Sequence, residues 1–130
     1  MRRLESTIGC MRIVQRGEVS ETYGGRFTGS VELEMLQPAD ADNRPDVARV
    51  HFREGAVTNW HSHPGGQHLY LLQGRGRVGM PDGEHDIAPG EYVVAPADER
   101  HYHGAARGAD AVWLAITWGT TVWEDAPENA

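Results

Sequence analysis

The sequence predicts an all-β fold, a single antiparallel β-barrel, from the way its residues are spaced. Sixteen Gly and seven Pro break the 130-residue chain into short pieces, and no stretch keeps the helical i, i+3, i+4 pattern over three turns. Short apolar or alternating segments recur between turn residues instead. Closing such strands into a sandwich or barrel removes exposed strand edges, so we expect that architecture.

The expected strands start in the first half of the chain. Residues 31–36 and 48–52 alternate apolar and polar side chains, which gives each strand one buried and one solvated face. Gly and Pro residues then mark turns at short, regular intervals. The strands between those turns cover residues 69–72, 76–80, 92–95 and 111–118.

We expect one domain, because 130 residues leave room for one core. Residues 25–123 are expected to form the barrel. The N-terminal segment 1–24 has no strong strand pattern in its first twelve residues, and two alternatives remain open for it: disorder, or pairing with a partner subunit's sheet, exchanged in a dimer. The acidic tail 124–130 is expected to fray.

The composition disfavours some classes of partner. Nineteen acidic against twelve basic residues give a formal charge of -7, which repels nucleic-acid backbones and anionic membrane surfaces. No stretch is long enough to span a bilayer, and the N-terminus lacks the apolar run of a signal peptide. The single Cys10 cannot close an internal disulfide, so we expect a cytoplasmic protein without nucleic-acid or membrane partners.

Five of the seven His residues fall into two clusters, which is the main functional signal. His61 and His63 are two residues apart, so on a strand both imidazoles point to the same face. A Pro-Gly-Gly turn follows, and Gln67 then opens the next apolar strand. His101 follows a loop at the start of a returning strand, and closure of the barrel would bring it to the same place. We therefore predict a transition-metal site.

At these residues the chain resembles the cupin superfamily. Its first motif reads Gly55, five residues, His61-Ser62-His63, three residues, Gln67, six residues and Gly74. Its second motif reads Gly83, five residues, Pro89-Gly90, then Pro96 and His101. The family's loop glycine is Asp98 here, and its Asn after the second-motif His is Ala105. The resemblance implies a double-stranded β-helix, or jelly roll, and a homodimer.

The resemblance also implies a ligand set, namely His61, His63, Gln67 and His101. The family's usual Glu is Gln67 here, so no carboxylate compensates the charge of a divalent ion, which strengthens its Lewis acidity. Mn, Fe, Ni and Zn all accept imidazole, and we favour Mn or Fe. The same segments are similar to bacterial manganese-dependent hydroxynitrile lyases with a three-His, one-Gln site. Those lyases have a further His where this chain has Leu114 or a neighbour.

The remaining candidates surround this site. His103 shares the face of His101 and is our candidate general acid or base, the alternative being a hydrogen bond across the barrel mouth. Trp60, Tyr102 and Trp113 could line a pocket for an organic substrate, although barrel cores also use aromatics. Arg75 and Arg77 flank Gly76 on a predicted hairpin and could attract an acidic substrate or be ordinary exposed residues.

These residues lead us to expect a metal-dependent enzyme, of lyase or dioxygenase type, that acts on a small oxygen-bearing molecule at open metal positions. Two alternatives remain open. One is a non-catalytic cupin that binds a small molecule. The other is a cyclase or isomerase that helps a biosynthetic pathway.

Overall fold

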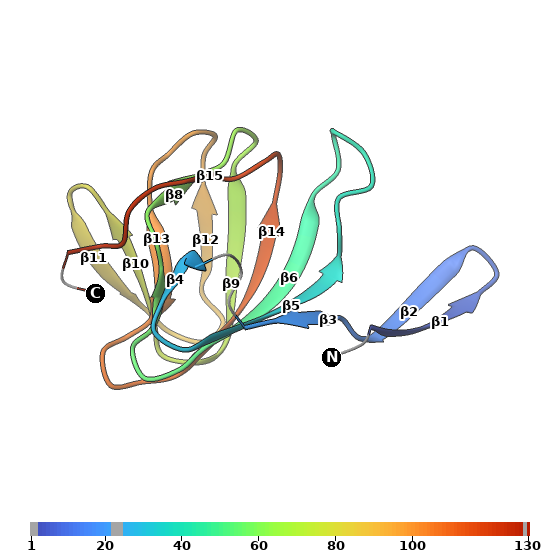
Figure 1. The fold of residues 1–130 in the computed structure, drawn as a ribbon, viewed down its shortest axis with the longest axis horizontal. Coiled ribbons are helices and arrows are strands. Elements are labelled where there is room, and N and C mark those ends of the chain that lie inside the picture. Colours follow the sequence, from blue (N-terminus) through green and yellow to red (C-terminus); the bar gives the residue numbers. More distant parts are fainter. Residues whose placement is uncertain (1–2, 22–24, 129) are drawn as a thin grey trace.

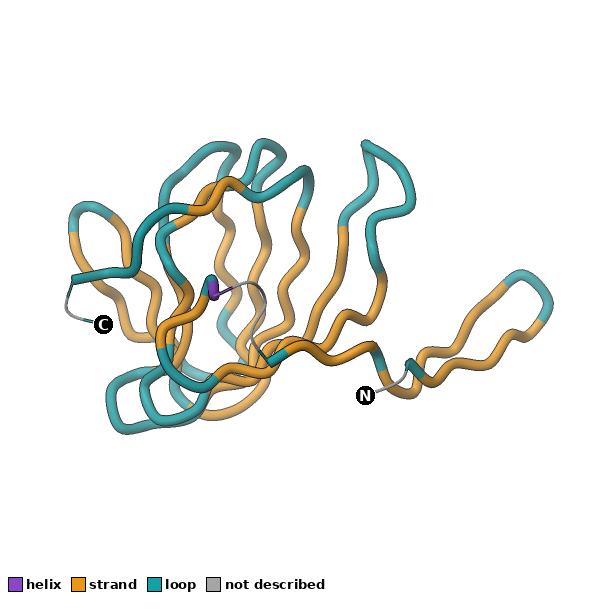
Figure 2. Tube along the Cα trace, in the orientation of Figure 1, coloured by secondary structure: helices purple, strands orange, loops and turns teal. Residues whose placement is uncertain are grey.

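The computed structural model describes residues 3–21, 25–128 and 130, and apart from one 3-10 residue at Gly25 the elements in this part of the chain are strands (Figures 1 and 2). Every strand pair is antiparallel. The all-β prediction is therefore confirmed. Within the described ranges no helix is long and apolar enough to cross a membrane.

Two sheets form the body of the molecule. One has the order β11 (Gly83–Ile87), β10 (Gly76–Met80), β13 (Tyr102–Ala105), β7 (Val57–Thr58) and β4 (Phe27–Thr28). The other has the order β12 (Tyr92–Ala95), β9 (Gln67–Gly74), β14 (Ala111–Thr117), β6 (Asp46–Phe52), β5 (Val31–Gln37) and β3 (Glu18–Ser20). In the described residues no ladder joins the two sheets edge to edge, so the barrel is open at its sides.

The core lies between the two sheets and depends on strand alternation. Along β14, every second residue is buried, and Trp113 has no exposed surface. Along β9 the same alternation buries Leu69 and Leu71. At the end where β9 begins, the buried residues become polar: Gln67 pairs with Thr117 across the ladder. The polar end of these two strands positions the site.

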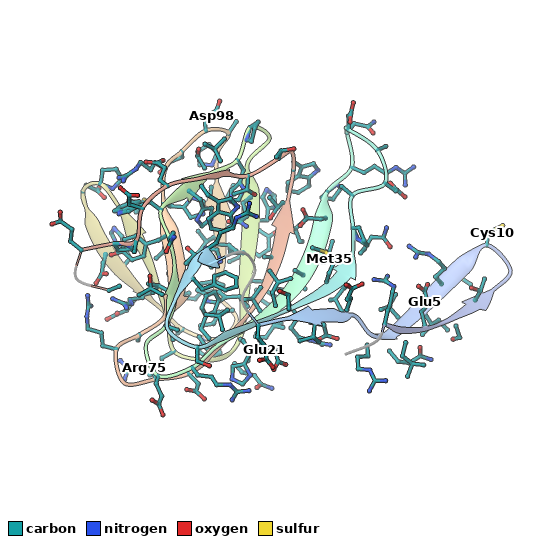
Figure 3. All side chains as sticks on the ribbon, viewed as in Figure 1. Glu5, Cys10, Glu21, Met35, Arg75 and Asp98 are labelled. Carbon is teal, nitrogen blue, oxygen red and sulfur yellow. The ribbon has the colours of Figure 1, made fainter. Side chains whose placement is uncertain are left out.

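The N-terminal segment differs from what we expected. β1 (Leu4–Ile8) and β2 (Met11–Arg16) form a hairpin that projects from the barrel, with Cys10 at its tip (Figures 1 and 3). β3 then pairs with β5 and extends the six-stranded sheet before residue 25. Ordered strands thus replace the disordered alternative for these residues. Residues 22–24 lie outside the described part, and exchange in a dimer stays a prediction.

The C-terminal segment crosses the barrel mouth instead of fraying at residue 124. β15 (Val122–Trp123) pairs with β8 (His61–Ser62). Beyond it, the amide of Glu124 donates to the carbonyl of Trp60 at 2.8 Å, and the amide of Trp60 donates to the carbonyl of Asp125 at 3.0 Å. Glu124 and Asp125 are therefore held to the barrel, although the tail was expected to begin at residue 124. Residue 129 lies outside the described part.

Candidate metal centre

Three His residues meet where the two sequence clusters lie side by side. The backbones of His61 and His101 exchange two hydrogen bonds of 2.9 Å, which fixes the clusters against each other. His63 lies one residue beyond β8, on the same side as His61. Ligand atoms of the three rings lie within 4.8 Å of one another, and all three side chains are buried. The predicted convergence of these residues is therefore present.

The turn after His63 brings Gln67 back to the same point. Gly66 has φ +86°, and a Cβ there would lie 2.8 Å from the carbonyl oxygen of Ala95, so the turn needs glycine. Asp98, at the position of the family's loop glycine, has φ 65°, and its amide donates to the His63 carbonyl at 2.8 Å. Asp tolerates this left-handed conformation better than most residues, which explains how the substitution leaves the loop intact.

Hydrogen bonds at the Nδ1 atoms orient the three rings. Nδ1 of His61 lies 2.8 Å from the carbonyl oxygen of Asn59, and Nδ1 of His101 lies 3.1 Å from that of Glu99. A carbonyl only accepts, so both Nδ1 atoms carry the proton, and a lone pair is left on Nε2. Nδ1 of His63 contacts the Thr121 hydroxyl at 3.0 Å. Such contacts behind the ring are typical of metal-binding His residues.

The amide of Gln67 is oriented in the same way. Its Nε2 donates to the Thr117 hydroxyl at 2.8 Å, which turns Oε1 toward Nε2 of His101 at 2.9 Å. In neutral His101 with its proton on Nδ1, both of these atoms are acceptors. Nε2 of His63 is buried and has no hydrogen-bond partner among the described residues. A cation in contact with these atoms would satisfy all of them, so the donor set fits a divalent metal ion.

Burial keeps these rings neutral. It is the main cause that lowers the pKa of His63 to about 4, and the neighbouring His101 adds to it. Burial likewise lowers the pKa of His61 and of His101 below the usual range. Metal ligation needs the deprotonated ring, so the site is prepared for a metal near neutral pH.

A small cavity of about 50 Å³ lies next to these residues. Its opposite wall is apolar and consists of Phe27, Leu33, Met35, Ala48, Val50 and Phe52. His103 also lines the cavity, with its ring centroid 5.4 Å from that of His61, as its predicted orientation requires. Its Nδ1 is buried without a partner among the described residues, and burial holds its pKa well below the usual range.

The three aromatic residues that we expected at the pocket do not line this cavity. Trp113 is buried in the core, where its indole N–H donates to the Gly104 carbonyl at 2.9 Å. Tyr102 opens β13 (Tyr102–Ala105), directly after His101 and before His103, so its side chain points to the other face, where its hydroxyl donates to Glu84. Trp60 packs edge-on against Tyr102, with ring centroids 4.7 Å apart.

The cavity is also lined by residues that were not predicted as site residues, among them Thr121, Trp123 and Asp46. Thr121 and Trp123 arrive on the C-terminal segment, and no local pattern indicates that it returns to the mouth. Asp46 precedes Ala48 and Val50 at strand spacing. That alternation was the available signal, because it places all three side chains on the inner face.

Comparisons with known proteins agree with this geometry. The chain is 38% identical over 91 residues to an (R)-mandelonitrile lyase of Granulicella tundricola, covering 69% of this chain and 70% of that protein. The crystal structure of a cupin-like protein from Thermotoga maritima has a TM-score of 0.79 at 32% identity, covering 88% and 90% of the two chains. That of the polyketide cyclase RemF from Streptomyces resistomycificus shares the fold, with a TM-score of 0.63, 18% identity and 88% and 79% coverage. Residues 48–117 match the cupin domain family, so this chain is a cupin.

Proposed function

We propose that this cupin is a metal-dependent enzyme that binds one divalent ion through His61, His63, Gln67 and His101. Its substrate is a small oxygen-bearing organic molecule, and its chemistry is of the lyase or dioxygenase type. The observation that carries the proposal is the contact of 2.9 Å between Gln67 Oε1 and His101 Nε2. With the proton of His101 on Nδ1, these two atoms are both acceptors, and together with the unpartnered Nε2 of His63 they favour a shared cation.

The donor set guides the choice of metal. Three neutral imidazoles and one amide leave the charge of a divalent ion uncompensated, and we favour Mn(II) or Fe(II) over Ni(II) or Zn(II). When bound, such an ion supplies Lewis acidity toward an oxygen of the substrate. The chain's own contribution is to hold the four donors in place through Thr117, Thr121 and the carbonyls behind His61 and His101.

His103 is the residue that we assign to proton transfer. It lies on the cavity beside the ligands but is not needed to complete the ligand set, and it is neutral near pH 7 because of its burial. A neutral imidazole accepts a proton from a substrate hydroxyl and returns it later. The apolar wall formed by Val50, Phe52 and their neighbours excludes water from this exchange.

The lyase form has the more specific support. The Granulicella relative is an (R)-mandelonitrile lyase, which is similar over two thirds of this chain. Leu114, where we aligned a further His of such lyases, has its side chain on the outer face of β14. The inward neighbours are Trp113 and Ala115, neither of which can move a proton. If this chain is a lyase, His103 therefore acts without that second His.

The activity test separates the two chemistries. Metal-loaded wild type and the His103→Gln variant are incubated with (R)-mandelonitrile without oxygen, and aldehyde release is measured. The same proteins are then given small 2-hydroxy and 2-oxo acids in air, and oxygen uptake is measured. We expect turnover in one arm, reduced at least about 100-fold in His103→Gln. His68→Gln, which changes an outward His bonded to Tyr92, is the control and keeps full activity.

No turnover in either arm by a protein that retains its metal would contradict the enzymatic proposal. A non-catalytic cupin that binds a small molecule would then be the better account. Turnover that His103→Gln does not reduce would leave the enzyme assignment intact and would remove His103 from it.

A further inference from the structure

Asp46 is the one carboxylate among the described residues that line the metal-site cavity. No described residue makes a hydrogen bond or an ion pair with its side chain, which is partly buried. The surrounding wall is largely apolar, as Leu33, Met35 and Ala48 show. A carboxylate in such a place, with no structural partner, is costly to keep unless it binds something.

The ladder places Asp46 at a defined distance from the metal ligands. Thr117 on β14 pairs with Gln67 on the neighbouring strand β9 and with Asp46 on the other neighbouring strand, β6. The three residues thus form one row across β9, β14 and β6, and all three side chains line the cavity. Strands lie about 4.8 Å apart, so the Cα atoms of Gln67 and Asp46 are about 10 Å apart. Both side chains line the cavity, so a ligand that reaches from Gln67 to Asp46 would need two polar atoms separated by a few covalent bonds.

Asp46 also borders a second, outer space. A groove of about 720 Å³ runs along the outside of the mouth, and it shares Asp46, Thr121 and Trp123 with the cavity. Charged residues of both signs line the rest of this groove: Arg26, Asp40, Asp42 and Arg44. On the cavity side, the titratable groups that line the same space are His61, His63 and His103. Asp46 therefore borders both the groove and the metal-site cavity.

We infer that Asp46 determines substrate specificity by binding a hydrogen-bond donor, a hydroxyl or an ammonium group, on the end of the substrate remote from the metal. This inference rests on the proposed function and narrows its substrate class. The substrate has two polar ends: an oxygen for the metal and, a few bonds away, a donor for Asp46. A molecule that ends in an alkyl group leaves the carboxylate unpaired, and one that ends in a second acid is repelled.

Burial acts on Asp46 in a way that agrees with this role. It raises the pKa of the carboxyl to about 6, and no cation among the described residues opposes that rise. A substrate ammonium group would supply the missing positive charge. A hydroxyl would supply a hydrogen bond to the same oxygen atoms.

The test is a binding experiment on Mn(II)-loaded protein with three probes that share one three-carbon chain. Propionate, 3-hydroxypropionate and 3-aminopropionate each carry one carboxylate for the metal, and they differ only at the far end. Calorimetry measures their affinities for wild type, Asp46→Asn and Asp42→Asn. Asp42 lines the outer groove but not the cavity, so it is the matched control. Metal content and thermal unfolding of each variant are measured first, to confirm loading and folding.

We expect wild type to bind 3-aminopropionate at least about 10-fold more tightly than propionate, with 3-hydroxypropionate between them. Asp46→Asn should bring the amino and alkyl probes to within about 3-fold of each other, and Asp42→Asn should keep the wild-type preference. The ratio between the amino and hydroxy probes shows which donor the site prefers.

The two ways of failing are distinguishable. If propionate binds to wild type but the amino and hydroxy probes bind no better, the inference is overturned and the proposed function stands. A preference that survives in Asp46→Asn overturns it too. If metal-loaded wild type binds none of the probes, the metal has no open position for an oxygen ligand, and the proposed function fails together with this inference.

Discussion

Arg77 and His63 are both buried polar residues, but they lie toward opposite ends of the interior. Figure 3 marks these ends with Arg75 and Asp98. We name them the arginine end (Arg77, Gly55 and Ala105) and the metal end (His61, His63, Gln67 and His101). Arg77 is 2% exposed, and each of its three guanidinium nitrogens has a partner: it donates to the carbonyls of Ala105 and Gly55 at 2.8 and 2.9 Å and pairs with Glu84 at 3.1 Å.

At the metal end the buried polar atoms are not all paired. His63 Nε2 has no partner among the described residues, nor has Nδ1 of the adjacent His103. Gln67 Oε1 and His101 Nε2 present acceptors to each other. A buried polar group with hydrogen-bond partners stabilises a fold, whereas a buried polar group without them costs stability and is retained where it binds a ligand. Apolar substitutions should therefore lower the free energy of unfolding at the arginine end and raise it at the unpaired atoms of the metal end.

The largest effect is expected at the arginine end. Arg77→Met leaves the buried carbonyls of Ala105 and Gly55 without their donor, so we expect the free energy of unfolding to fall by about 3 kcal/mol. Urea unfolding of metal-free protein measures this. Arg75→Met, a neighbour on the same hairpin, should change it by less than about 0.5 kcal/mol. Equal losses in the two variants would mean that burial of Arg77 contributes nothing special.

The metal end should make the metal-free protein sensitive to acid. The unfolded His63 takes up a proton near pH 6.5, whereas in the folded protein its pKa is about 4. Its contribution to stability is thus complete above pH 6.5 and is lost as the pH falls toward 4. We expect the loss between pH 7 and pH 4.5 to include about 2 kcal/mol from this residue. Urea unfolding of wild type and His63→Leu at pH 7 and pH 4.5 measures this. The free energy of unfolding should fall less in the variant than in wild type between the two pH values; an equal fall in both proteins would contradict the prediction.

A smaller effect of opposite sign is expected at His103. Replacing it by Leu removes a buried unpaired nitrogen and keeps the volume similar, so metal-free His103→Leu should be about 1 kcal/mol more stable than wild type. Thermal unfolding provides the measurement. A destabilised His103→Leu variant would show that this ring, like Arg77, is there for structure.

The smallest effect concerns the loop above the metal end. Asp98 has φ 65°, and its replacement by Gly relieves strain at some cost in chain entropy. We expect Asp98→Gly to raise stability by about 0.5 kcal/mol and Asp98→Ala to lower it. In thermal unfolding, the midpoint temperatures of the two variants should lie on either side of the wild-type value. A change in the same direction in both variants would argue against strain at this position.

The sequence was sufficient to predict much of this site, because its determinants are local. His61 and His63 point the same way by strand alternation, and the glycines after them allow Gln67 to return. The resemblance to cupins supplied the partner His101 on a distant strand. The fold class followed from the spacing of turns, although the open sides of the barrel did not.

What could not be predicted depends on contacts between segments far apart in the chain. Thr121 and Trp123 reach the cavity because β15 pairs with β8, and nothing in their own sequence specifies that pairing. Arg75 and Arg77 are alike in sequence, and only the positions of the Ala105 and Gly55 carbonyls make one of them a buried structural residue. Trp60, Tyr102 and Trp113 do not line the cavity. For Tyr102 the reason is simpler, since strand alternation alone places its side chain on the face opposite that of His101 and His103.

The most direct test of the central claim, that the metal end is built to hold a metal, is the metal content of untagged protein by plasma mass spectrometry. Wild type, His63→Ala, His101→Ala and the outward control His68→Ala are compared after incubation with Mn, Fe, Ni or Zn. We expect about one equivalent of one metal in wild type and His68→Ala, and less than about a tenth in the other two. Wild type that stays empty with all four metals would contradict the account.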